Sequence, residues 1–94
     1  MPLVNPVHML QAARTGGYCI GAFNLVDFLT LKAIVEAAQE QRSPVMLQTS
    51  SATVKQLGLP TIATMAHLVA DDSPVPIALH LDHGTDPMVI REAI

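Results

Sequence analysis

The chain has 94 residues and a formal net charge of −3 at pH 7; half of its residues are hydrophobic and only 14% are charged. Its five Lys and Arg residues are scattered, so it lacks both the clustered basic surface of a nucleic-acid-binding protein and the basic flank of a membrane-surface helix. The apolar stretches are far shorter than the roughly 20 residues that span a bilayer, and the N-terminus has no signal-peptide core, so neither nucleic acid nor membrane is an expected partner.

The first two predicted elements are a short helix and a buried strand. Asn5 is placed to cap a helix over residues 7 to 14, with Pro6 at its first position. Residues 18 to 24 (YCIGAFN) are short and apolar, which predicts a buried strand. Cys19 lies in this run and is therefore interpreted as a small buried hydrophobic residue rather than a reactive thiol. A single cysteine forms no internal disulfide, which favours a cytoplasmic, reducing location.

A second helix and strand follow. Asp27 is placed to cap a helix over residues 28 to 41, which Ser43-Pro44 ends. A short apolar run predicts the next strand at residues 45 to 48. One face of the helix is predicted from apolar residues at helical spacing, namely Leu31, Ile34, Val35 and Ala38.

The next segment is predicted to be mostly helical. A helical turn around residues 53 to 57 stops at Gly58, and Pro60 opens a longer helix that runs to the loop at residues 71 to 74. Residues 77 to 82 (IALHLD) are the third predicted strand. The apolar face of the longer helix consists of Ile62, Met65, Ala66 and Val69.

A last helix is predicted to start at Asp86-Pro87, with Val89, Ile90, Ala93 and Ile94 apolar. A leading helix followed by three strand–helix units is typical of a parallel α/β protein, and continuously apolar strands indicate a sheet covered on both faces. Periodicity does not separate an open sheet from a (β/α)8 barrel, but three strands cannot close a barrel, which needs eight strands and about 250 residues. The low charged fraction predicts apolar surface that more chain or a partner covers.

Polar residues stand where each of the three predicted strands ends. The first strand ends at Asn24, the second at residues 48 to 51 (QTSS), and the third at residues 80 to 84 (HLDHG). In a parallel sheet these ends meet at one edge, where ligands bind. The sequence therefore predicts a site at this edge.

The third strand end carries the most chemistry. Strand alternation places His80 and Asp82 on one side and Leu81 on the other. His83 begins the loop, where it is free to turn toward the same cavity, and Gly84 is expected to permit that sharp turn. Neutral imidazole is a common metal ligand, and a neighbouring carboxylate suits proton transfer.

Structural interpretations of these residues remain open at this point. No CxxC or HExxH motif is present to indicate a metal, and Asp82 could be a buried, hydrogen-bonded cap of the following turn. His80 is better interpreted as a wall residue than as a ligand. Asn24 and Ser50 are equally suited to forming turns. His67 lies on a helical stretch, where a surface position is expected.

The run PIALHLDHGTD (residues 76 to 86), together with GAFN (residues 21 to 24) and PVMLQTS (residues 44 to 50), resembles the class II, zinc-dependent fructose/tagatose-bisphosphate aldolases. The resemblance covers all 94 residues, which correspond to the first third of the family's domain. It implies that the fold is the N-terminal part of a (β/α)8 barrel, about three strand–helix units, so that residues 1–94 form an incomplete domain.

The resemblance also implies roles for individual residues. His83 corresponds to one of three zinc-ligating histidines, the other two of which belong to later strands. Asp82 corresponds to the acid/base that exchanges a proton with the C4 hydroxyl of the substrate. Asn24 and Ser50 correspond to substrate-contacting positions, with Gln48 beside them.

The implied activity is the reversible, zinc-dependent cleavage of fructose 1,6-bisphosphate to dihydroxyacetone phosphate and glyceraldehyde 3-phosphate, a reaction of glycolysis and gluconeogenesis. A tagatose-1,6-bisphosphate aldolase is an alternative, and so is a truncated, non-catalytic chain that needs the missing barrel or a partner. A third alternative is another phosphate-binding barrel in which His80, Asp82 and His83 occur together by coincidence. A homo-oligomer, dimer or tetramer, is implied at full length. Since one histidine cannot hold zinc tightly, the 94-residue chain alone is expected to be inactive.

Overall fold

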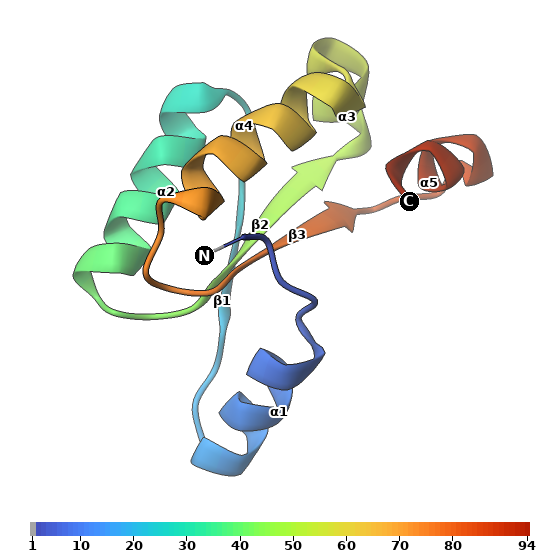
Figure 1. The fold of residues 1–94 in the computed structure, drawn as a ribbon. Coiled ribbons are helices and arrows are strands. Elements are labelled where there is room, and N and C mark those ends of the chain that lie inside the picture. The colour runs from blue at the N-terminus through green and yellow to red at the C-terminus, as the bar shows by residue number, and fades with distance from the viewer. Residues whose placement is uncertain (1) are drawn as a thin grey trace.

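The structure is a computed structural model that describes residues 2–94 (Figure 1). In chain order its elements are α1 (Val7–Gly16), β1 (Gly21–Asn24), α2 (Phe28–Glu40), β2 (Val45–Ser50), α3 (Ser51–Leu57), α4 (Leu59–Asp71), β3 (Ile77–Asp82) and α5 (Pro87–Ala93). Among the described residues, no helix combines the length and apolar character needed to cross a membrane.

The three strands form one parallel sheet in the order β1-β2-β3. Helices α2 and α4 lie side by side over one face of this sheet, while α1 lies apart from them, beyond the start of β1 (Figure 1). Helices α3 and α5 begin where β2 and β3 end. The parallel α/β arrangement predicted from the alternation of strand and helix patterns is confirmed.

The core lies between the sheet and the α2–α4 layer. In β2 the burial alternates, so that Val45, Leu47 and Thr49 are buried and the residues between them are less so. The predicted helix faces pack against this side of the sheet, as expected from their spacing. The buried cluster consists of Leu25, Leu31, Val35, Ala38, Val45, Leu47, Ala66, Ala70, Val75 and Ile77.

Strand β1 is shorter and more exposed than predicted. It begins at Gly21, opposite Val45, because the residue before Val45 is Pro44, which has no N–H for a ladder hydrogen bond. No other strand of the described chain covers the outer edge of β1, and Phe23 is 54% exposed. Cys19, predicted to be buried within this strand, is exposed and lies before the strand begins.

The ends of three other elements also differ from prediction. Strand β2 continues beyond residue 48 to Ser50, because β3 offers partners as far as Asp82. The helical turn expected around residues 53 to 57 is a helix that begins at Ser51. Helix α5 starts at the predicted place but has no buried residue, so its apolar face lies uncovered.

The caps of α1 and α2 contrast with each other. Asp27 caps α2 as predicted, in a reciprocal arrangement with Thr30: the Asp27 carboxylate accepts from the Thr30 N–H at 2.8 Å, and the Thr30 hydroxyl oxygen accepts from the Asp27 N–H at 3.1 Å. Hydrogen bonds from Thr30 lower the pKa of Asp27. In α1 the N-cap is Pro6 rather than Asn5, whose side-chain oxygen instead accepts from the Val7 N–H at 3.0 Å.

The buried side of the sheet makes a direct prediction about stability. Leu47→Ala removes a wholly buried side chain from the middle of β2 and is expected to lower the free energy of unfolding by about 2–5 kcal/mol. Leu29→Ala is the matched control, because Leu29 lies on α2 with 75% exposure, and its effect should stay within about 0.5 kcal/mol. Urea unfolding followed by circular dichroism measures both, and equal losses for the two variants would contradict this core.

Candidate active site

The register of the sheet brings together the polar residues predicted at the ends of the three strands. Asn24 pairs with Gln48, Gln48 with His80, and Ser50 with Asp82. Register partners in a parallel sheet share a face. Since the alternate residues of β2 are buried against the helices, these five side chains lie on the sheet face opposite α2 and α4.

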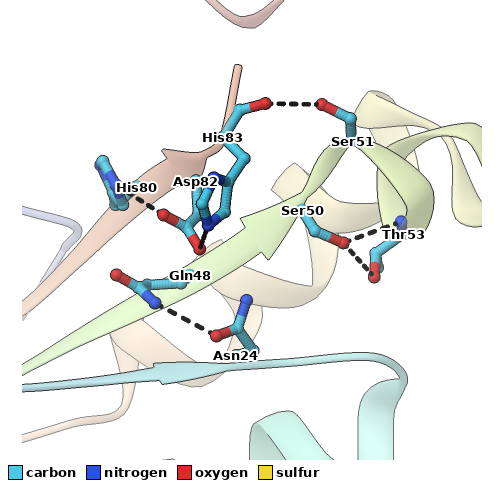
Figure 2. A network of polar contacts seen from close by, with 8 residues as sticks. All are labelled: Asn24, Gln48, Ser50, Ser51, Thr53, His80, Asp82 and His83. Carbon is cyan, nitrogen blue, oxygen red and sulfur yellow. Dashed lines mark hydrogen bonds and ion pairs between the residues drawn. The ribbon is translucent and has the colours of Figure 1, made fainter. Parts of the chain in front are cut away.

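The carboxylate of Asp82 lies between two imidazole rings (Figure 2). Its Oδ1 is 3.7 Å from Nε2 of His80, and its Oδ2 is 3.6 Å from Nε2 of His83. These separations exceed ordinary hydrogen-bond lengths, so the oxygens are close to the rings without being engaged in short bonds. The side chain of Asp82 is 26% exposed. It is therefore sheltered and still able to meet a ligand.

Asp82 is 26% exposed and so is not the fully buried residue of the structural alternative, and it does not cap the next helix. The helix that follows, α5, is capped by Asp86, whose carboxylate accepts from the Met88 N–H at 2.9 Å. The side chain of His80 is 44% exposed and stands on the same face as Asp82, as alternation predicted. His80 thus forms a wall of the same polar cluster.

The sharp turn after β3 occurs at His83 itself and not at Gly84 as predicted. His83 has a φ of 54°, in the left-handed region that few residues other than glycine adopt. At Gly84 an added Cβ would lie 2.8 Å from Cδ2 of Leu81, so a larger residue there would have to displace the end of that side chain. The side chain of His83 is 86% exposed, so its ring is available to a ligand.

The amide and hydroxyl groups of the site also make internal contacts (Figure 2). The Gln48 side chain donates from Nε2 to Oδ1 of Asn24 at 3.1 Å. Ser50 is the N-cap of α3: its hydroxyl oxygen accepts from the Thr53 N–H at 3.3 Å and lies 3.2 Å from the Thr53 hydroxyl. Ser50 therefore has the turn-forming role left open by the sequence. Asn24 and Gln48 hold each other across the two strands.

Two contacts of this region were not predicted from the sequence. Thr53 joins the Ser50 cap, and its position three residues after a serine is a recognisable capping signal. The Ser51 hydroxyl donates to the backbone carbonyl of His83 at 3.2 Å. This contact joins residues 32 positions apart, and no local pattern indicates it.

One side chain of the site has the chemistry of a metal ligand. His83 suits a zinc ligand in its imidazole chemistry and its exposure. Within residues 2–94, however, no group of three or more His, Cys, Asp or Glu side chains is arranged so that it could hold a metal ion. The described residues therefore fit one ligand position of a zinc site and do not complete the site.

Comparison with known proteins places this chain in a family. The family model described as "Fructose-bisphosphate aldolase class-II" matches residues 4–94. A fructose-bisphosphate aldolase from Helicobacter pylori is 43% identical over 84 residues, which cover 88% of this chain and 27% of that protein. A 6-phospho-5-dehydro-2-deoxy-D-gluconate aldolase from Bacillus licheniformis is 38% identical over 97 residues, covering 100% of this chain and 33% of that protein.

Solved structures give the same result. The YdjI aldolase from Escherichia coli K12 superposes with a TM-score of 0.89 at 26% identity, covering 97% of this chain and 36% of that one. A putative fructose-1,6-bisphosphate aldolase from Coccidioides immitis superposes with a TM-score of 0.83 at 32% identity, covering 92% of this chain and 32% of that one.

The chain spans about a third of the length of the curated relatives that it matches. Together with the parallel sheet, these likenesses confirm the predicted fold class, the first part of a (β/α)8 barrel. The family model matches almost the whole chain, including all three strand ends that form the site. The chain belongs to the class II fructose-bisphosphate aldolase family.

Proposed function

We propose that residues 1–94 form the N-terminal segment of an aldolase domain that reversibly cleaves fructose 1,6-bisphosphate into dihydroxyacetone phosphate and glyceraldehyde 3-phosphate. The observation that carries this proposal is the Asp82 carboxylate, held between His80 and His83 at the edge of the sheet where parallel α/β proteins bind their ligands. Membership of the family supports the reaction class.

Asp82 is the proposed acid/base. In the cleavage direction a carboxylate oxygen of Asp82 takes the proton of the substrate's C4 hydroxyl, C4–O becomes a carbonyl, and the electron pair of the C3–C4 bond stays with C3. In condensation the same proton returns to the new hydroxyl. The partial exposure of Asp82 suits this role, since a general base must lie within hydrogen-bond reach of the proton that it abstracts.

His83 is the proposed zinc ligand of this segment, with the remaining ligands supplied from outside these 94 residues. When bound, zinc would provide Lewis-acid stabilisation for the negative charge that develops on the substrate as the bond breaks. His83 directs an exposed ring toward the Asp82 side of the loop, so that ligand and base are adjacent. Without the other ligands we expect the 94-residue chain to bind zinc weakly and to be inactive.

Asn24, Gln48 and Ser50 are proposed to contact the substrate. All three lie on the same sheet face as Asp82, and each keeps unused hydrogen-bonding capacity beyond its internal contacts. An amide donates and accepts, so Asn24 and Gln48 suit the hydroxyl groups of a sugar phosphate. The Ser50 hydroxyl, already oriented by its cap of α3, suits the same class of ligand.

Tagatose 1,6-bisphosphate, the C4 epimer, stays the alternative substrate, because nothing in the arrangement of Asp82 and its neighbours discriminates the two epimers. A truncated, non-catalytic chain is the second alternative. An apolar groove of about 520 Å³ beside α2 and β1, whose lining includes Phe23, Ile34 and Ala37, is compatible with it, as it is with a segment that the rest of the barrel covers. A homo-oligomer, a sugar-bisphosphate partner, a place in glycolysis and a cytoplasmic location remain predictions.

The test is an assay of the complete gene product with each bisphosphate in turn, in which dihydroxyacetone phosphate is detected by a coupled dehydrogenase. We expect formation of dihydroxyacetone phosphate from fructose 1,6-bisphosphate, with a higher kcat/KM than from tagatose 1,6-bisphosphate. A higher kcat/KM with tagatose 1,6-bisphosphate would make that sugar the substrate and would leave the proposed roles of Asp82 and His83 unchanged. No product from either sugar would contradict the proposed function and favour the non-catalytic alternative.

A further inference from the structure

The contact between Ser51 and His83 joins the start of α3 to the loop after β3 (Figure 2). The Ser51 hydroxyl donates to the carbonyl oxygen of His83 at 3.2 Å. It bonds the backbone of the histidine and leaves the imidazole free. The contact therefore acts on the conformation of residue 83.

That conformation decides where the His83 ring points. If β3 continued as an extended strand, residue 83 would share the side of Leu81, toward the helix layer and away from Asp82. The left-handed φ of 54° interrupts the alternation, and Nε2 of the ring comes to lie 3.6 Å from Oδ2 of Asp82. A side chain that holds the carbonyl of residue 83 stabilises this uncommon backbone state against the extended one.

The Ser51 hydroxyl has no competing role in the helix that it begins. The N-cap of α3 is Ser50, whose side chain accepts from the Thr53 N–H. Ser51 stands at the first helical position, where a hydroxyl is not needed for capping. Its hydrogen bond to the loop after β3 is therefore separable from the formation of the helix.

We infer that Ser51 is a positioning residue that holds His83 in the left-handed turn and so keeps its ring beside Asp82, in the orientation proposed for a zinc ligand. The inference rests on the proposed role of His83 as a zinc ligand. Groups that orient a metal ligand from the outer shell change metal affinity by about 10- to 100-fold when they are removed. For a bond to the backbone of one ligand, the lower end of that range is expected.

The experiment measures the zinc dissociation constant of the complete gene product by competition with a chelating dye, without any assay of turnover. Ser51→Ala should weaken zinc binding by about tenfold. Ser51→Thr keeps the hydroxyl and should restore the affinity to within about twofold of wild type. His83→Ala is the reference for loss of the ligand, and circular dichroism confirms that all variants are folded.

The outcomes distinguish the positioning role of Ser51 from the zinc-ligand role of His83. If His83→Ala weakens zinc binding strongly while Ser51→Ala leaves it unchanged, the positioning role is overturned and the metal site stands. If Ser51→Thr is as weak as Ser51→Ala, the hydroxyl is not the active group and the inference also fails. If His83→Ala binds zinc like wild type, both the inference and the assigned ligand are wrong.

Discussion

Asp82→Asn in the complete gene product is expected to lower kcat by about 10²- to 10⁴-fold while leaving the zinc content unchanged. The amide keeps the size of the side chain but cannot take the proton of the substrate hydroxyl. Because Asp82 is proposed to act on the proton and not on the metal, its loss should affect kcat far more than metal binding. Steady-state kinetics and metal analysis of the same preparation measure the two effects together.

Asp72→Asn is the matched control for this variant. It removes an exposed carboxylate at the C-terminal end of α4, on a different part of the molecule, and should change neither quantity. If the Asp82→Asn variant keeps a kcat within a few-fold of wild type, Asp82 is not the acid/base of the reaction. Loss of zinc together with activity would instead make Asp82 part of the metal site.

His83→Ala is expected to have the second large effect, on the metal first and on turnover as a consequence. Removing one ligand from a site built on three protein ligands should weaken zinc binding by more than the roughly 10- to 100-fold lost with an outer-shell partner. Zinc analysis after dialysis should find the variant depleted, and its activity should be correspondingly low.

The control for the histidine is His67→Ala. His67 is exposed on α4, outside the cluster around Asp82, so the variant should retain both zinc and activity. A His83→Ala protein that keeps full zinc occupancy would contradict the assignment. Equal zinc loss in the two variants would indicate a general effect on the fold.

Much of this architecture follows from local patterns in the chain. The apolar spacing of Leu31, Val35 and Ala38 predicted the buried face of α2, and Asp27 predicted its start, because caps and amphipathic faces are properties of neighbouring residues. The same locality placed His80 and Asp82 on one face of β3, since strand alternation needs no tertiary information.

The remaining features depend on contacts that no local pattern contains. The exposure of Phe23 depends on whether a neighbouring strand covers β1, and an apolar run has the same appearance in either case. The turn at His83 was assigned to Gly84, because glycine is the usual residue at positive φ. A hydrogen bond from Ser51, 32 residues earlier, is available to hold His83 there instead.

The measurement that tests the central claim most directly is cleavage of fructose 1,6-bisphosphate by the complete gene product before chelation, after chelation and after readdition of zinc. A class II mechanism that uses His83 and Asp82 predicts that chelation abolishes cleavage and that about one equivalent of zinc restores it. Cleavage that is indifferent to chelation would contradict the account, because the role proposed for His83 and the metal-dependent reaction would then both fail.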